Sequence, residues 1–340
     1  AKVSFIEEEV KDIDFNLKKI VLSNRPSVNY SKLVLNFGSQ TIIPNEFESL
    51  VKNRNAFTIK PFLRAYDLIQ KEDIFDSVNE LPFVIVGSGL AAIEVSYALR
   101  KRWRGRSLKL LCDSRKINNT ILKSLRNSNI DLVQNLNFDY GKILLCTGNT
   151  SPLWVQKKFL DSDSHGRIIT NQNLQLKSLS GIFAAGDCAV VDSAKRPASG
   201  VFAVKVVNTL VKNLKKDIEG GSLRKWLPQR IGLQIINIFP SHHQKAFAIY
   251  RKFVFGPSFL FWILKHKIDL NFINKFRSKR LIMKGSGKNI SLNDCRGCAA
   301  KIPQSFLNKS LIKSNLDSFA SSPEDSVEIY QNGQDIILQS

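Results

Sequence analysis

The chain has 340 residues and carries 50 Lys and Arg residues against 29 Asp and Glu residues, which gives a formal net charge of +21. Hydrophobic residues make up 43% of the chain and charged residues 23%, which excludes a largely disordered or collagen-like protein and is typical of two or three compact domains. Five cysteines are too few for a disulfide-held scaffold, and the sequence contains no uncharged apolar run of about 18 residues, as a membrane-spanning helix requires.

The basic residues are concentrated in one part of the chain. Residues 205–313 contain 22 Lys and Arg residues against four acids, whereas residues 314–340 contain five acids and no bases. Such a charge suits a nucleic acid, an anionic membrane or phosphorylated ligands, or reflects a generally Lys-rich composition. Because no zinc-finger spacing or RNA-recognition signature accompanies the charge, we expect no nucleic-acid partner.

In chain order, the first apolar runs predict a hairpin over 5–22 and a strand over 32–41 that ends in Gly-Ser. Residues 46–78 have a helical pattern, with an apolar face made by Phe62, Leu63, Tyr66, Leu68 and Ile69.

The next segment combines a fully apolar strand, a glycine turn and a helix. The turn runs from Gly87 to Ala92 with the form G-x-G-x-x-A, directly after the strand 83–86 and before Ile93 and Glu94 of the helix. In such a turn Gly87 permits the tight bend, Gly89 lets a pyrophosphate approach the backbone, and Ala92 lets the helix pack on the strand. The context predicts a dinucleotide site in which Gly87, Gly89, Ala92 and Glu94 bind the cofactor. The alternative is a glycine turn that closes an ordinary β–α unit.

A second strand, 107–113, ends in an acid. Asp113 is placed to accept a hydrogen bond from an adenosine ribose 2′-hydroxyl, which favours NADH. Arg115 lies two residues later and could instead meet a 2′-phosphate, so NADPH stays open.

The remaining pattern alternates strands and helices. We expect a helix over 121–128 and then strands over 130–134, 142–149 and 181–189. An amphipathic helix over 202–216, a pair of strands over 228–255, an aromatic basic helix over 258–280 and a polar linker over 284–289 follow.

Two strand ends complete a family signature. Thr147-Gly148 ends one apolar strand and Gly186-Asp187 ends another. In this order after the first turn, they resemble the two-dinucleotide-binding flavoproteins. The resemblance implies that Thr147-Gly148 leads the chain out of the NAD domain and that Asp187 binds the ribityl chain of FAD. The helix that follows would then direct its positive end towards the flavin. The alternative for Gly186-Asp187 is a plain turn after a strand.

Lys60-Pro61, residues 196–204 and Trp262 with residues 265–269 narrow this resemblance to the type II NADH dehydrogenase-like branch. More narrowly, they are similar to the flavoprotein domain that is fused to selenide, water dikinase. The resemblance covers residues 1–283, with two departures. The family's first G-x-G-x-x-G, which holds the ADP half of FAD, does not occur in this sequence, and the stretch 113–146 is short.

The cysteines of this part predict no redox centre. Cys112, Cys146 and Cys188 lie on or beside apolar strands, where small buried residues are expected, and no dithiol spacing links them. A dithiol reductase is therefore disfavoured.

The last fifty residues hold a separate motif. Cys295 and Cys298 form a C-x-x-C that suggests half a zinc site or a thioredoxin-like dithiol, although further ligands and a preceding strand are lacking. The run from Gly297 to Pro303 resembles the catalytic motif of selenide, water dikinase. The resemblance makes Cys298 and Lys301 catalytic and places Asp325 on an Mg²⁺–ATP ligand position.

The aromatic basic helix over 258–280 has two interpretations. It suits an anionic membrane interface, and it equally suits a core helix with a solvated basic end. The first interpretation predicts peripheral membrane contact.

We therefore expect an α/β flavoprotein with two dinucleotide-binding domains, followed by the start of a dikinase domain. Because neither end of the sequence resembles a chain terminus, we expect a fragment truncated at both ends. We expect the first part of an FAD domain over 1–77, an NAD(P) domain over 78–150 and the second part of the FAD domain over 151–235. C-terminal strands with the basic helix follow over 236–283, then a linker over 284–289 and a dikinase-like segment over 290–340.

The expected function is FAD-dependent oxidation of NAD(P)H, fused to a dikinase that uses Mg²⁺ and ATP on small-molecule substrates. A membrane-associated NADH:quinone oxidoreductase and a non-catalytic nucleotide-binding module are the alternatives. We expect a cytoplasmic protein, with peripheral contact at the inner membrane face and a homodimer of the intact protein left open.

Overall fold

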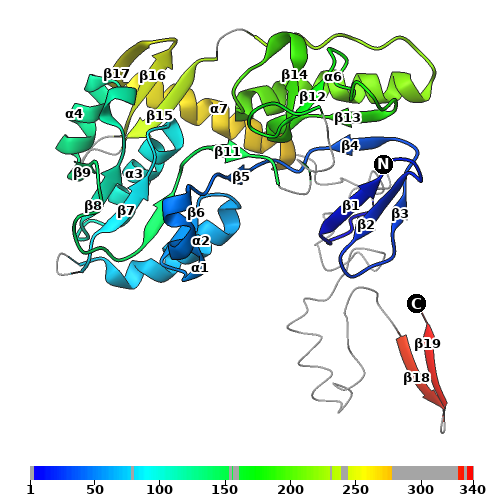
Figure 1. Cartoon of the computed structure of the whole chain (residues 1–340), viewed down its shortest axis with the longest axis horizontal. Coiled ribbons are helices and arrows are strands. Elements are labelled where there is room, and N and C mark those ends of the chain that lie inside the picture. The colour runs from blue at the N-terminus through cyan, green and yellow to red at the C-terminus, as the bar shows by residue number, and fades with distance from the viewer. Residues whose placement is uncertain are drawn as a thin grey trace, which may run out of the picture. The chain divides into compact units, whose positions relative to one another are not determined.

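A computed structural model describes residues 4–77, 80–152, 155, 161–229, 232–238, 244–277, 328–332 and 335–339. The chain divides into two units, residues 1–273 and 274–340 (Figure 1). In the second unit, β18 (Glu328–Asn332) and β19 (Asp335–Gln339) pair antiparallel. In the part of the chain that the structure describes, no helix is both long enough and apolar enough to cross a membrane.

A five-stranded parallel sheet forms the centre of the first unit. Its strands lie in the order β6 (Ala56–Thr58), β10 (Ile143–Leu145), β7 (Phe83–Val86), β8 (Leu108–Leu111) and β9 (Ile130–Val133). Every residue of β7 is buried, because helices cover both faces of a parallel sheet and leave no polar side. The run of strands predicted from the apolar segments is confirmed.

Two helices make the crossovers of this sheet. α3 (Leu90–Arg102) joins β7 to β8, and α4 (Asn119–Asn127) joins β8 to β9. Ile93, Tyr97 and Trp103 lie buried in the same core as Phe83. Trp103 packs edge-on against the Phe83 ring at 4.9 Å between centroids, so the end of α3 is held against the strand that leads into its start.

The helix predicted over 46–78 is only partly correct. The structure has α1 (Glu48–Lys52) and α2 (Phe62–Lys71), and between them the edge strand β6 pairs with β10. The predicted apolar face of α2 is buried only at Ile69, which lies with Ala65 in the core, whereas Phe62 and Leu63 are 62% and 74% exposed. A short apolar run does not distinguish helix from strand, and the sheet's free edge decided the outcome.

The second part of this unit is built on smaller sheets. β4 (Leu33–Leu35) pairs parallel with β13 (Ile182–Ala184), and β12 (Ile168–Thr170) pairs parallel with β14 (Ala189–Val191). α6 (Gly200–Ile218) packs Val206 and Leu210 on this core. An antiparallel meander of β1 (Val10–Asp14), β2 (Lys19–Leu22) and β3 (Val28–Asn29) precedes β4 and includes the predicted hairpin.

The chain passes twice between the two parts. β5 (Gln40–Thr41) runs towards the five-stranded sheet and β11 (Asn149–Thr150) runs back, and the two pair antiparallel (Figure 1). β6 therefore belongs by its pairing to the five-stranded sheet, although the sequence placed it in the first FAD-domain segment.

A third layer packs against α3. β15 (Gln234–Ile238), β16 (Lys245–Tyr250) and β17 (Phe253–Ser258) form an antiparallel sheet, followed by α7 (Phe259–Arg277). Ile236, Ile238 and Phe247 share the core of α3, so this layer continues the hydrophobic core of the five-stranded sheet. The pair of strands predicted over 228–255 is in fact three strands, because the second apolar run folds into the hairpin of β16 and β17. The helix predicted over 258–280 is confirmed as far as Arg277.

Candidate functional site

The turn after β7 is built around a glycine that no other residue can replace without strain. Gly87 has φ +144°, and a Cβ there would lie 2.4 Å from the carbonyl oxygen of Cys146, which is main chain and cannot rotate away. Ala92 is fully buried, and its Cβ lies 3.2 Å from the position that a Cβ on Gly87 would take. Gly87 and Ala92 thus serve the close packing of helix and strand that the motif predicted.

Gly89 differs from Gly87, because the fold itself does not require a glycine there. Its φ of −87° suits any residue, and a Cβ would meet no atom within 4 Å. It is the N-terminal cap of α3, whose first backbone N–H groups have no partner within the helix. The missing side chain therefore leaves a cradle at a helix N-terminus, which is the arrangement that receives phosphate.

An open groove of about 950 Å³ adjoins this turn. It is lined by the turn itself, by the residues after β8 and β10, and by the segment before α1: Pro44, Glu46, Phe47, Val86, Gly87, Ser88, Leu111, Cys112, Asp113, Ser114, Arg115, Gln134, Leu136 and Thr147. The groove lies at the carboxyl ends of the parallel strands, where open α/β sheets bind their ligands.

The two residues predicted to distinguish NADH from NADPH face each other at this groove. Arg115 donates two hydrogen bonds to the Asp113 carboxylate, at 2.9 Å from Nε and 3.1 Å from Nη2. These bonds hold the pKa of Asp113 below its ordinary value. The Ser88 hydroxyl accepts the Asp113 backbone N–H at 2.9 Å, which ties the end of β8 to the glycine turn.

Glu94 takes a different partner from the one expected. Its carboxylate accepts a hydrogen bond at 2.9 Å from Nζ of Lys265 on α7, and Lys265 also donates to the carbonyl oxygen of Ile235 at 3.2 Å. Glu94 does not line the groove at Gly87. The pair connects the nucleotide-type helix to α7. The sequence contained Lys265 only as part of a family motif and offered no signal for this contact.

Thr147 and Gly148 lie where the chain leaves the five-stranded sheet. Thr147 lines the groove, and its hydroxyl donates to the carbonyl oxygen of Ile42. The Gly148 carbonyl accepts the Ile42 N–H at 3.1 Å, and Gly148 has φ +115°. The pair anchors the returning strand to the outgoing one, next to the β5–β11 crossover.

The second strand end brings together three residues that are distant in the sequence. Lys60 Nζ donates to Asp187 Oδ2 at 2.8 Å and to the Ser39 hydroxyl at 2.8 Å, and Ser39 donates to the same carboxylate at 3.4 Å. Gly186 has φ +81°, and a Cβ there would lie 2.4 Å from Oδ1 of Asn36. Sequence reasoning found Asp187 and Lys60 separately, and it missed Ser39.

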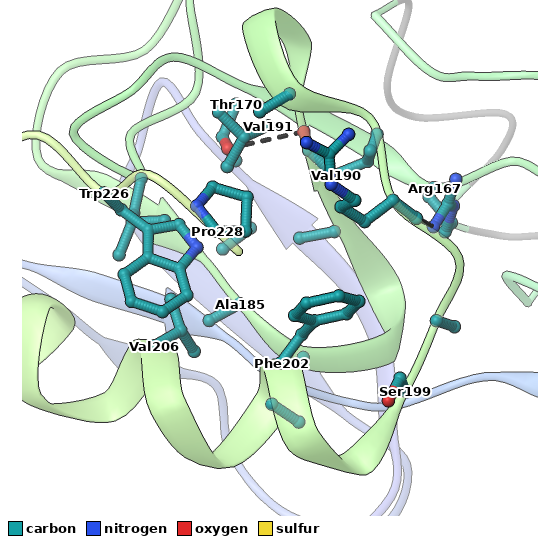
Figure 2. A pocket seen from close by; sticks show the side chains of 18 of the residues that line it. Arg167, Thr170, Ala185, Val190, Val191, Ser199, Phe202, Val206, Trp226 and Pro228 are labelled. Atoms are coloured by element: carbon teal, nitrogen blue, oxygen red, sulfur yellow. Dashed lines mark hydrogen bonds between the residues drawn. The ribbon is translucent and has the colours of Figure 1, made fainter. Parts of the chain in front are cut away.

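A cavity of about 190 Å³ adjoins Asp187, lined also by Ser39, Asn149, Thr150, His165, Arg167, Pro197 and Ala198. Arg167 is held by Asp163 at 2.6 Å and donates to the carbonyl oxygen of Arg196 at 2.6 Å. A smaller pocket of about 60 Å³ continues beneath α6, with Phe202, Val206 and Trp226 around it and Arg167 on the side away from Trp226 (Figure 2). The site thus has polar walls next to an apolar pocket.

The three described cysteines are buried thiols, as predicted. Burial raises the pKa of Cys146 to about 12 and that of Cys188 to about 11, and it also raises the pKa of Cys112. Among the described residues, no group of three or more His, Cys, Asp or Glu side chains could hold a metal ion. Cys298, Lys301 and Asp325, predicted for the dikinase-like segment, and the linker 284–289 lie outside the described residues.

Comparison with known sequences gives distant relatives, and no family model matches the chain. Ferroptosis suppressor protein 1 of Taeniopygia guttata is 24% identical over 263 residues, which are 65% of this chain and 67% of the relative. The human protein of the same name is 24% identical over 264 residues. A probable NADH dehydrogenase of Dictyostelium discoideum is 28% identical over 243 residues, which are 54% of this chain and 53% of that protein.

Several solved structures share the fold of this chain. The sulfide:quinone oxidoreductase of Aquifex aeolicus superposes with a TM-score of 0.57 at 16% identity, over 80% of this chain and 75% of that one. The water-forming NADH oxidase of Lactobacillus brevis, bound to NADH, gives 0.53 at 18% identity, over 71% and 58%. The CoADR-RHD protein of Bacillus anthracis gives 0.55 at 17% identity, over 72% and 48%.

The chain therefore has the mixed α/β fold of these solved structures, and its distant relatives include ferroptosis suppressor proteins and a probable NADH dehydrogenase. It spans about two thirds of the length of the ferroptosis suppressor proteins, at 67%, and about half of the Dictyostelium relative, at 53%. None of the proteins named here is a selenide, water dikinase.

Proposed function

We propose that this chain binds NAD(P)H and FAD and transfers a hydride from the nicotinamide to the flavin. The observation that carries the proposal is the cradle at Gly89, where the fold leaves room that its own packing does not need, at the N-terminus of α3. The relative named probable NADH dehydrogenase and the structural neighbour bound to NADH support the same nucleotide.

In this proposal the groove at Gly87 receives the nicotinamide nucleotide. The backbone N–H groups of the first turn of α3 bind its pyrophosphate, and the residues after β8 bind the adenosine ribose. Asp113 accepts from a 2′-hydroxyl when Arg115 turns away, whereas Arg115 binds a 2′-phosphate when it releases Asp113. The pair thereby sets the choice between NADH and NADPH.

The residues around Asp187 fit the second cofactor. Asp187 and Ser39 offer acceptors and a hydroxyl beside a cavity, and the ammonium of Lys60 supplies positive charge next to them. When bound, a flavin supplies the capacity to accept a hydride and to pass electrons onward. Lys60 and the N-terminus of α6, capped by Ser199, provide the positive potential that favours a reduced, anionic flavin.

Anaerobic titration of the full chain tests this proposal. We expect purified protein to retain FAD or to bind it when FAD is added, and we expect NADH to bleach the visible flavin bands. Asp113→Ala should raise the apparent Kd for NADH and lower that for NADPH, while Arg115→Ala should do the opposite. A chain that binds neither FAD nor NAD(P)H would contradict the proposal and leave no oxidoreductase function to assign.

A membrane-associated NADH:quinone reductase is a second proposal, favoured by the surface of β17 and α7. Phe253, Phe255, Phe259 and Leu260 are between 50% and 72% exposed there, next to a helix with several Lys residues. Such a surface suits an anionic bilayer. Flotation with vesicles of phosphatidylglycerol should carry the protein, and Leu260→Glu with Phe255→Glu should prevent it. Equal flotation of the variant would contradict this proposal.

The fusion to a selenide, water dikinase stays a proposal that rests on the sequence resemblance alone, chiefly on residues 295–325. In a protein that carries a whole dikinase domain, it predicts selenide-dependent ATP consumption that Cys298→Ser and Lys301→Gln abolish. It also predicts NAD(P)H oxidation that an oxidised selenium compound accelerates. A rate of ATP consumption that does not depend on selenide, or that is unchanged by both substitutions, would contradict it. The alternative of a non-catalytic nucleotide module predicts nucleotide binding without flavin bleaching.

A further inference from the structure

A second open groove lies along the other edge of the five-stranded sheet, at β6. We call it the α2 groove. It has a volume of about 600 Å³ and is lined by Val51, Arg54, Ala56, Phe57, Thr58, Pro61, Arg64, Ala65, Leu68, Lys71, Glu72 and Lys142. It shares no residue with the groove at Gly87 or with the cavity at Asp187. Nothing in the proposed hydride transfer uses it.

The base of the α2 groove is apolar. Ala56 of β6 and Ala65 of α2 are 3% and 0% exposed, and these small side chains leave the space between strand and helix unfilled. Phe57 and Leu68 add apolar surface from the same two elements. A volume of this size, with apolar walls, falls in the range of pockets that hold small organic molecules, about 300–1,000 Å³.

The charge around the groove is positive. Arg54, Arg64, Lys71 and Lys142 all line it. Lys142 is fixed at one end, since its Nζ donates to the carbonyl oxygen of Arg54 at 2.9 Å and to Oδ1 of Asn55 at 3.1 Å. For the side chains of Arg54, Arg64 and Lys71, the described residues provide no ion pair or hydrogen bond.

The one carboxylate in the lining does not offset this charge. Glu72 is 9% exposed, and its Oε2 accepts from Nη1 of Arg106 at 2.9 Å, an arginine that is 3% exposed. The charge of Glu72 is therefore neutralised by the buried Arg106, and the other cations of the lining remain available to a ligand.

We propose that the α2 groove binds a small anionic amphiphile, with its apolar body against Ala56, Ala65 and Leu68. Its carboxylate, sulfonate or phosphate group lies among Arg64, Lys71 and the other two cations of the lining, Arg54 and Lys142. The apolar base alone would accept a neutral hydrophobic molecule. The unpaired guanidinium and ammonium groups at its rim select an anion, because a charged group makes its strongest hydrogen bonds with an opposite charge.

Calorimetric titration of the full chain with decanoate, below its micelle concentration, tests the proposal. We expect one bound decanoate per chain, much weaker binding of 1-decanol, which lacks the charge, and no binding of acetate, which lacks the apolar body. Absence of decanoate binding, or decanol binding as tight as that of decanoate, would overturn the proposal.

Two variants locate the binding in this groove. Arg64→Gln with Lys71→Gln should weaken decanoate binding about threefold to tenfold, as expected for two exposed ion pairs. Leu68→Glu, at a position 38% exposed, should weaken it further, because it introduces a like charge at the apolar wall without removing a buried side chain.

Matched controls separate this site from other surfaces. Lys123→Gln removes an exposed cation from α4, and Leu260→Glu alters the exposed aromatic surface of α7; neither should change decanoate binding. Decanoate binding that Leu260→Glu abolishes, or that Leu68→Glu leaves intact, would contradict the assignment. NAD(P)H and FAD binding by the Leu68→Glu variant should equal that of the unmodified chain, so failure here is distinct from failure of the proposed hydride transfer.

Discussion

The two glycine turns of the molecule look alike in sequence but are constructed differently. Gly87 packs against main chain, the carbonyl group of Cys146, and also lines an open groove. Gly186 instead packs against a side chain, that of Asn36, and the carboxylate of the adjacent Asp187 accepts hydrogen bonds from Lys60 and Ser39. A local motif describes the first turn almost completely, whereas distant residues complete the second.

The largest expected effect is on the free energy of unfolding when Gly87 or Gly186 is replaced by alanine. Gly87→Ala should lower the free energy of unfolding by about 3 kcal/mol or more, since its Cβ overlaps main chain and its φ of +144° is strained. Gly186→Ala should lower it by only about 1–2 kcal/mol, since the exposed Asn36 side chain can rotate away. Urea denaturation measures both. Adding Asn36→Ala should restore part of the Gly186→Ala loss and none of the Gly87→Ala loss, and equal losses in the two glycine variants would refute the distinction.

A second prediction concerns the free space at Gly89. Gly89→Val should raise the Kd for NAD(P)H about tenfold or more, an effect of roughly 1.4 kcal/mol in binding, because its side chain fills the cradle. The free energy of unfolding should change by less than about 1 kcal/mol, the usual effect of an altered helix cap. Gly221→Val is the control, because a Cβ there meets nothing closer than 3.7 Å. Unchanged nucleotide affinity in Gly89→Val would remove the strongest support for the proposed function.

A third prediction concerns the polar cluster of the second turn. Lys60→Met should lower the free energy of unfolding by about 1 kcal/mol, because it leaves the partly buried Asp187 without its cation, and it should also weaken flavin retention. Lys177→Met removes an ion pair of similar length, 2.7 Å to Asp192, at a more exposed place. An exposed pair contributes roughly 0–1 kcal/mol, so this control should be near neutral. Thermal denaturation measures the change in stability, and the flavin content of the purified variants measures flavin retention. Equal stability and flavin content in the two variants would contradict the prediction.

The smallest effect is expected at the cysteines that flank the two turns. Burial raises the pKa of Cys146 to about 12 and that of Cys188 to about 11. A raised thiol pKa means less thiolate at a given pH, so at pH 8 the reactive fraction is on the order of 10⁻⁴ for Cys146 and 10⁻³ for Cys188. Mass spectrometry after iodoacetamide treatment should find neither labelled in the native protein, and both labelled after denaturation. Rapid labelling of the native Cys146 would show that the first turn opens.

Much of the site could be predicted because its signals are local. The strand, turn and helix around Gly87 follow from an apolar run, two glycines and an alanine, all within contact range along the chain. The burial of Cys112, Cys146 and Cys188 follows from the apolar strands that carry them. The helix α6 was predicted from its amphipathic pattern.

What the sequence by itself determined, then, was the order of strands and helices and the first nucleotide turn, because those depend on neighbours a few residues away. Only the tertiary structure decided that β6 joins the sheet edge, that Lys60 and Ser39 meet Asp187, and that Lys265 binds Glu94. These contacts join residues that are far apart in the sequence, and no single-sequence pattern encodes such a distance. The exposed face of α2 has the same origin, since which face of a helix is buried depends on what packs against it.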